Sequence, residues 1–203
     1  MRLRNSVLLF LSVFLFRMFP LYGTAQNGPT NNNSRNDFKF TLLSLGSGSA
    51  RITYERAFSP INSGEFTLGF IGLGWDWLND SHPRGLLLKL AYKWRLLPQR
   101  SSDSWLAGFY VKPELAWAGF SHRYKYQEPV EEPSKCPDRT IQMALLAECG
   151  YQLLKGWFVF DIYSGLGPSV GTKNDYNYYH SFMLFPKDGW LAFTAGFRIG
   201  VAF

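Results

Sequence analysis

The stretch Trp190-Leu-Ala-Phe-Thr-Ala-Gly-Phe-Arg-Ile-Gly-Val-Ala-Phe203 decides the fold class of this protein. Its residues alternate with a period of two, the period at which successive side chains of a β-strand reach opposite faces of a sheet. One face is fully apolar, and the other carries small residues and Arg198. Because a strand of a soluble sandwich alternates in the same way, the alternation predicts a strand but leaves its surroundings open.

The aromatic residue at position 203 favours a membrane barrel over a soluble sandwich. An aromatic end in phase with the apolar face is similar to the terminal strand of bacterial outer-membrane barrels. We therefore interpret four residues of this face as a membrane-assembly signal: Phe197, Ile199, Val201 and Phe203.

Seven further segments alternate in a similar way. They cover residues 37–45, 50–58, 66–77, 86–96, 105–123, 141–153 and 158–166. Short turns follow the second, fourth and sixth segments, whereas polar loops follow the third, fifth and seventh, the longest at 124–139 and 172–189. Eight strands with short turns at one end and long loops at the other predict an all-β fold, a single eight-stranded antiparallel up-and-down transmembrane β-barrel over residues 37–203.

Two segments fit this pattern less well. In residues 66–77 the apolar phase changes after Phe70, so that Ile71 joins the lipid-facing set, and nearby glycines predict a bulge there. Pro113 lies inside the fifth strand, although proline is normally confined to edge strands or bulges. A barrel has no edge, so Pro113 counts against the prediction unless a bulge accommodates it.

The first 25 residues have the composition of a cleaved signal peptide. Arg2 and Arg4 precede an apolar run that is too short to span a membrane, and small residues follow. Residues 26–36 have no apolar side chain and are predicted to form a disordered leader. Cleavage removes three arginines and no acidic residue, which lowers the formal net charge from +6 to +3. No basic cluster remains that would indicate nucleic-acid binding.

Aromatic residues lie near both predicted ends of the strands, where the interfaces of a membrane barrel carry aromatic girdles. A soluble barrel with an aromatic core, binding an apolar ligand, is the alternative. The expected periplasmic girdle consists of Trp94, Trp105, Tyr151, Trp157 and Phe203, and the outer one of Trp75, Trp77, Trp117 and Trp190.

Charged residues fall on the opposite phase to the apolar ones, and this phase faces the lumen. Together with Lys39, the network residues given below amount to seven cations and four carboxylates, so we expect only partial pairing between them. An eight-stranded barrel leaves room for little more than its own side chains, so we expect no open pore; a cation-lined pore is the alternative. The predicted lumen ion-pair network is Arg51, Glu55, Lys89, Lys93, Arg95, Lys112, Glu114, Glu148, Asp161 and Arg198.

No set of residues predicts catalysis, a metal site or a cofactor. Ser121 and His122 are adjacent on a strand and point to opposite faces, so they cannot act on each other. His180 and Ser181 lie in the last loop without a fixed orienting group. A membrane-embedded lipid A-modifying enzyme, a deacylase or acyltransferase, is the alternative to a non-catalytic barrel. Cys149 shares the apolar phase and is expected to face lipid.

Several short motifs resemble a family of small outer-membrane barrels. They are Leu42-Leu-Ser-Leu45, Ile52-Thr-Tyr-Glu-Arg-Ala-Phe58, Gly150-Tyr-Gln152 and Gly165-Leu-Gly167. These resemble a domain-of-unknown-function family of eight-stranded barrels from Bacteroidota-type bacteria, with OmpA- and OmpX-like architecture. The resemblance implies an outer-membrane location and carries over no catalytic residue. We expect a structural or surface-interaction role, with outer-membrane lipids, the barrel assembly machinery and a surface protein or glycan as partners.

Overall fold

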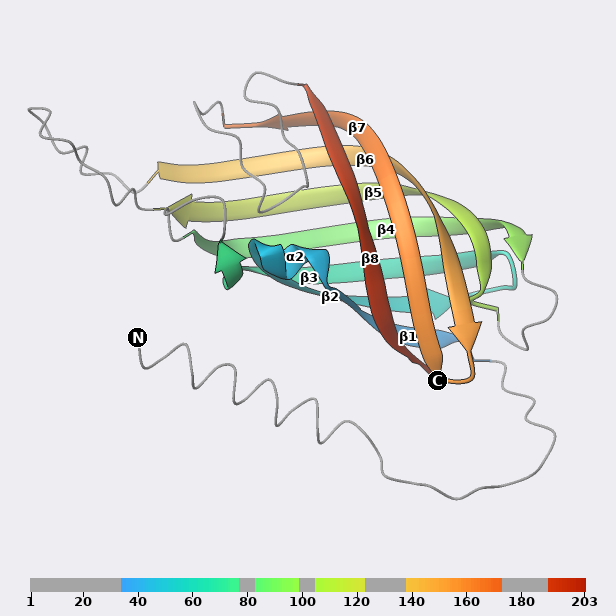
Figure 1. Ribbon diagram of the computed structural model, residues 1–203. Helices are drawn as coiled ribbons and strands as arrows, with labels where there is room; N and C mark the ends of the chain where they lie inside the picture. Colours follow the sequence, from blue (N-terminus) through green and yellow to red (C-terminus); the bar gives the residue numbers. More distant parts are fainter. Residues whose placement is uncertain (1–33, 77–82, 99–104, 123–137, 173–189) are drawn as a thin grey trace, which may run out of the picture. The chain divides into compact units, whose positions relative to one another are not determined.

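The computed structural model describes residues 34–76, 83–98, 105–122, 138–172 and 190–203. These residues form eight strands and one helical turn (Figure 1). No helix among them is long and apolar enough to cross a membrane. The elements are β1 (Asn36–Thr41), α2 (Leu43–Gly46), β2 (Ser47–Ala57), β3 (Asn62–Asp76), β4 (Arg84–Pro98), β5 (Gly108–His122), β6 (Asp138–Lys155), β7 (Phe158–Gly171) and β8 (Leu191–Ala202).

The strands form one closed antiparallel barrel in sequence order. The first and last strands close the wall through five residue pairs, from Asp37 opposite Ala202 to Thr41 opposite Arg198. The predicted all-β, eight-stranded antiparallel barrel is thereby confirmed. The expected signal peptide and residues 26–33 of the leader lie outside the described residues, as do residues 123–137 and 173–189 of the two long loops.

The end of β1 differs from the prediction. Residues 43–45, expected to continue the first strand, form part of α2 instead. Ser44 Oγ donates a hydrogen bond of 2.6 Å to the carbonyl oxygen of Thr41, and the backbone N–H of Leu45 donates to Leu42. These local bonds replace the bonds of a β-ladder, so β1 has six residues whereas the other strands have 11 to 18.

The phase change in β3 occurs later than predicted. Ile71 faces the interior and is 4% exposed, so its assignment to the lipid-facing set is wrong. The side chain of Trp75, four residues on, is on the exterior at 59% exposure. Gly72 lies between them with φ +97°, a conformation that favours glycine, and among the described residues β3 pairs with β4 no further than Ile71.

Pro113 is accommodated without a bulge at its own position. The β4–β5 pairing skips Lys112 and Pro113 and resumes with the same register on either side, while Pro113 remains paired with Ala147 of β6. The side chain of Pro113 is exposed. A gap of two residues in one ladder is therefore enough to accommodate the missing N–H.

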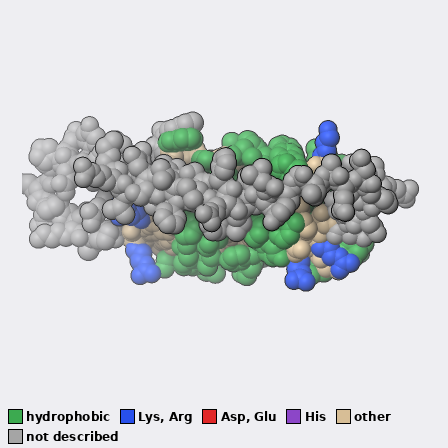
Figure 2. Space-filling model, turned by 90° about the horizontal axis from the view of Figure 1, so that it is seen from below, with side chains coloured by type: hydrophobic (Ala, Val, Ile, Leu, Met, Phe, Trp, Pro, Cys, Tyr) green, Lys and Arg blue, Asp and Glu red, His purple; other side chains and the backbone are tan. Residues whose placement is uncertain are grey.

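The barrel has two distinct ends. We call the end near α2, where β1, β3, β5 and β7 finish, the α2 end, and the opposite end, where β8 finishes, the Phe203 end. Between them the outer surface is largely apolar, and Figure 2 shows apolar side chains across the middle of one face with basic side chains toward both of its ends. Many large apolar side chains are more than a third exposed, among them Phe66, Leu90, Leu115, Leu145, Ile162 and Phe193.

The interior is apolar near the two ends and charged between them. At the Phe203 end, Ala57, Leu106, Val159 and Ala202 pack together, and Trp105 covers them. At the α2 end a second cluster consists of Ile71, Leu87, Ala118 and Phe120. Short apolar layers thus cap a polar centre, which is the reverse of a soluble protein, where the centre is apolar and the surface charged.

Candidate functional site

Thirteen charged side chains are buried in the described part of the barrel. Inward-facing positions on all eight strands contribute them, because each strand places every second side chain inside. The structure places all ten residues of the predicted lumen network here, and Lys39 with them. The seven cations are Lys39, Arg51, Lys89, Lys93, Arg95, Lys112 and Arg198, and the six carboxylates are Asp37, Glu55, Glu65, Glu114, Glu148 and Asp161.

Two of these carboxylates, Asp37 and Glu65, were missed in the sequence. They raise the expected four carboxylates to six, so the interior is nearly neutral instead of strongly cationic. β3 begins at Asn62, whereas the prediction began it at Phe66 and so left Glu65 outside the strand. The available signal was the phase: Glu65 is two residues before inward-facing Thr67, and Asp37 is two before Lys39.

Glu65 is the centre of the network. Its carboxylate lies 2.7 Å from Lys39 Nζ, 2.7 Å from Lys93 Nζ, 2.5 Å from Lys112 Nζ and 3.2 Å from Arg198 Nη1. These cations belong to β1, β4, β5 and β8, while Glu65 itself is on β3. One carboxylate therefore connects five strands around the barrel.

Glu55 forms a second node toward the Phe203 end. It lies 2.5 Å from Lys39 Nζ and 2.8 Å from Lys93 Nζ, and it also pairs with Arg95. Ser63 Oγ donates a hydrogen bond of 2.5 Å to the same carboxylate. Because Lys39 and Lys93 contact both glutamates, the two nodes share their cations.

A third node lies toward β4, β5 and β6. Glu114 pairs with Lys89 and, at 3.0 Å, with Lys112. Glu148 lies 3.1 Å from Lys112, the one ion pair recorded for Glu148 among the described residues. Lys112 thus joins this node to Glu65.

Neutral polar and aromatic side chains fill the remaining interior. Gln152 accepts a hydrogen bond of 2.9 Å from Lys93 and donates one of 2.8 Å to Asp37. The hydroxyl of Tyr110 donates to Asp161 at 2.7 Å, and Lys93 Nζ lies 4.0 Å from the centre of the Tyr110 ring. These contacts supply the hydrogen-bonding and cation–π partners that charges require away from bulk water.

Arg51 and Arg198 complete the set. Arg198 lies 3.4 Å from Asp161, and its guanidinium is 4.1 Å from the centre of the Tyr163 ring. Arg51 Nε donates a hydrogen bond of 3.1 Å to Ser49 Oγ. Charged side chains from opposite walls of the barrel therefore meet in its interior.

The candidate catalytic residues lie partly outside the described part of the chain. No cluster of three or more His, Cys, Asp or Glu suited to a metal ion occurs in this part of the chain. Ser121 and His122 are the last residues of β5, and Ser121 shares its phase with exposed Leu115. His180 and Ser181 lie outside the described residues, so the enzyme hypothesis stays untested.

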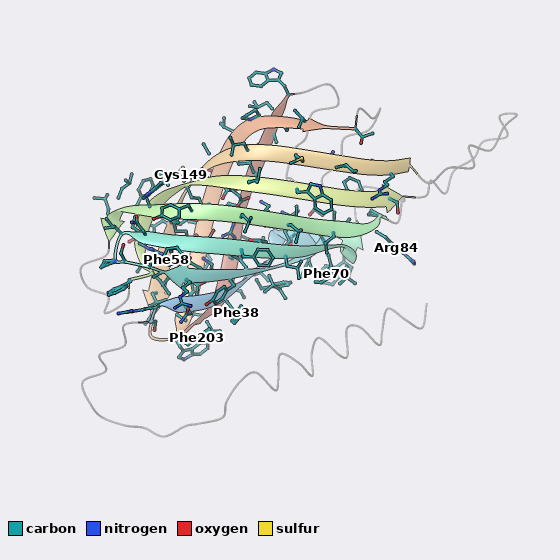
Figure 3. All side chains as sticks on the ribbon, turned by 180° about the vertical axis from the view of Figure 1, so that it is seen from behind. Phe38, Phe58, Phe70, Arg84, Cys149 and Phe203 are labelled. Atoms are coloured by element: carbon teal, nitrogen blue, oxygen red, sulfur yellow. The ribbon has the colours of Figure 1, made fainter. Side chains whose placement is uncertain are left out.

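The expected assembly and girdle residues lie mostly on the exterior. Phe197, Ile199 and Val201 are half-buried, and Phe203 is exposed and stacks with Phe38 at a ring-centre distance of 5.8 Å (Figure 3). Trp105 differs, because it packs on the apolar cluster at the Phe203 end, with the guanidinium of Arg35 4.0 Å from its ring centre. Six other expected girdle residues are exposed, namely Trp75, Trp94, Tyr151, Trp157, Trp190 and Phe203; Trp117 is half-buried, and Trp77 lies outside the described residues.

The fold and interior define a class: a closed eight-stranded antiparallel barrel with an apolar exterior and a charged, internally paired centre. Comparison with family models, with curated protein sequences and with solved structures gives no match for this chain.

Proposed function

We propose that this chain is a bacterial outer-membrane β-barrel without an open pore, with a structural or surface-interaction role exerted through the loops at its α2 end. The observation that carries the proposal is the inverted distribution of side chains. Apolar residues such as Leu90, Leu115 and Leu145 are about half exposed, while the described interior holds thirteen charges. In water this exterior would favour aggregation, whereas in a bilayer it is the favourable side.

The dimensions of the strands support the same proposal. A tilted membrane-spanning strand needs about 9–11 residues, and β2 to β8 have 11 to 18. The exposed charged side chains whose burial is described are all basic and lie toward the ends of strands: Arg35, Arg56, Arg84, Arg139 and Lys155. Charges at the rims and apolar residues between them are the pattern of a bilayer-spanning barrel.

The interior supports a closed lumen. Glu65 on β3 meets Arg198 on β8 and Lys112 on β5, so paired side chains extend across the barrel. Apolar clusters lie above and below them. A secreted barrel that binds an apolar ligand would need an apolar cavity, and this charged interior argues against that alternative.

The loops at the α2 end are the proposed interaction surface. In an outer-membrane barrel with its termini in the periplasm, the α2 end faces outward and displays residues 124–139 and 172–189. The Tyr-rich second loop suits contact with a surface protein or glycan. We assign no catalytic residue, and a lipid A-modifying activity would require a dependence of lipid A acylation on His122 or His180.

Fractionation and gel mobility test the proposal. We expect the protein in the outer-membrane fraction, extracted only by detergent, with different electrophoretic mobility before and after boiling. Circular dichroism of the extracted protein should be that of β-structure. A protein that remains in the soluble fraction without detergent, or that shows no mobility shift, would contradict the membrane proposal.

Conductance in a planar bilayer tests the closed lumen separately. The folded protein should give no steady ion current, because paired side chains occupy the centre of the barrel. Glu65→Ala, which removes the central carboxylate, serves as the comparison. Regular conductance steps from the unsubstituted protein would favour the cation-lined pore.

A further inference from the structure

We propose that Arg84, Ser121 and Arg139 form a site on the outer wall of the barrel for the phosphate headgroup of a membrane lipid. This inference rests on the proposed membrane location. The three residues lie on the adjacent strands β4, β5 and β6, with Arg84 opposite Ser121 and Ser121 opposite Arg139. They therefore form one row across three strands near the α2 end, where Figure 3 marks Arg84.

All three side chains are directed outward. Arg84 and Arg139 are exposed, and Ser121 is half-buried in the same phase as exposed Leu115. Neighbouring strands are about 4.8 Å apart, so the two arginine backbones are separated by about 10 Å with the serine between them. Two guanidinium groups can therefore approach one phosphate from both sides, with the serine hydroxyl as a third donor.

Among the described residues, neither arginine forms an ion pair with a carboxylate. The contrast with the interior is large, because there Lys39, Lys93 and Lys112 each contact several carboxylates. The two exposed positive charges thus have no internal neutralisation in this part of the chain. An anion from the surroundings is the complementary ligand.

The wall below this row is suited to an acyl chain. The next outward row is Leu86, Gly119 and Ile141, and the following one is Leu88, Trp117 and Met143. The Trp117 ring lies close over Gly119, since a Cβ on Gly119 would lie 3.0 Å from that ring. The hydrogen-bond donors for a phosphate lie directly above an aromatic ring and aliphatic side chains. This arrangement matches an amphiphile with an anionic headgroup, and not a free anion.

The Phe203 end provides a matched control. Arg56 and Lys155 are also exposed, but they lie on β2 and β6, which are not neighbours. Arg56 is flanked by Asn36 and Gly64 instead of a second cation. Removing this pair changes the net charge as much as removing Arg84 and Arg139, without affecting any row of donors.

Native mass spectrometry of the detergent-extracted full chain, titrated with dioctanoyl phosphatidic acid, tests the site. A basic residue near an anionic surface contributes about a 5-fold effect, so R84Q/R139Q should weaken the first binding step by about 30-fold. R56Q/K155Q should weaken it by less than about 3-fold. Equal losses in the two double variants would overturn the site in favour of general charge attraction. If R84Q/R139Q fails to fold, R84Q and R139Q are measured singly against R56Q, and equal effects overturn the site in the same way.

Two further measurements distinguish an anionic lipid from a free phosphate and from a zwitterionic lipid. Inorganic phosphate at the same concentration should not displace the lipid, and full displacement would mean that the site binds free phosphate. Phosphatidylcholine, whose headgroup is zwitterionic, should bind the unsubstituted protein at least 10-fold more weakly than phosphatidic acid. The same samples are checked for heat-modifiable mobility: a protein that shows it but has no preference for the anionic lipid refutes the site alone, and a protein without it refutes the membrane proposal.

Discussion

Replacement of Glu65 by glutamine should strongly destabilise the barrel. The side chain keeps its size and loses its charge, while four cations remain within 3.2 Å of its position. Breaking a buried ion pair by removing one partner typically costs about 3–5 kcal/mol. The cations Lys39 and Lys93 retain Glu55, and Lys112 retains Glu114, so we expect the lower part of this range, about 3 kcal/mol.

Urea unfolding in detergent micelles or vesicles, followed by tryptophan fluorescence, measures this loss. With a urea dependence of about 1–3 kcal/mol per M, a loss of about 3 kcal/mol lowers the unfolding midpoint by about 1–3 M. Glu148→Gln is the matched control. It removes the same charge from an equally buried side chain, but Glu148 has one recorded ion pair among the described residues, with Lys112 at 3.1 Å.

The control should lose about 1 kcal/mol or less, because its single cation, Lys112, retains Glu65 at 2.5 Å and Glu114 at 3.0 Å. Equal losses for the two variants would refute the central role of Glu65, because the net charge of the interior would then decide stability. An unchanged midpoint for Glu65→Gln would refute the ion-pair network as a source of stability altogether.

Three further outcomes are expected. Leu90→Arg, in the middle of the apolar exterior, should cost about 2–4 kcal/mol in unfolding from lipid vesicles, whereas Leu97→Arg near the Phe203 end should cost at most about 1 kcal/mol; similar costs would argue against a bilayer around the barrel. Gly150→Ala would place a Cβ 2.4 Å from the Tyr110 hydroxyl, so it should lower the free energy of unfolding by about 1–3 kcal/mol, measured by the same titration. The thiol of Cys149, on the exterior, should resist a membrane-impermeant maleimide in vesicles and react in SDS once the other cysteine is replaced by serine; rapid labelling in vesicles would contradict a lipid-facing position.

The regular strands were predictable because their signal is local. A period of two is visible in any segment, and in β6 it assigns outward positions such as Met143 and inward ones such as Glu148 as they occur in the structure. Two of the errors have equally local causes. A serine–backbone bond ends β1 at Thr41, and the phase of β3 changes at Gly72 instead of before Ile71.

The sequence by itself determined the number of strands, their order and the face of most side chains, because alternation follows from backbone geometry within one strand. Only the tertiary structure decided which charges meet. Glu65 contacts Lys39 and Arg198 because β1 and β8 close the wall of the barrel, and pairing across a lumen depends on strand tilt and register that no single segment carries. The pairing of β4 and β6 with β5 brings Arg84 and Arg139 into one row on the outside, although they lie 55 positions apart along the chain.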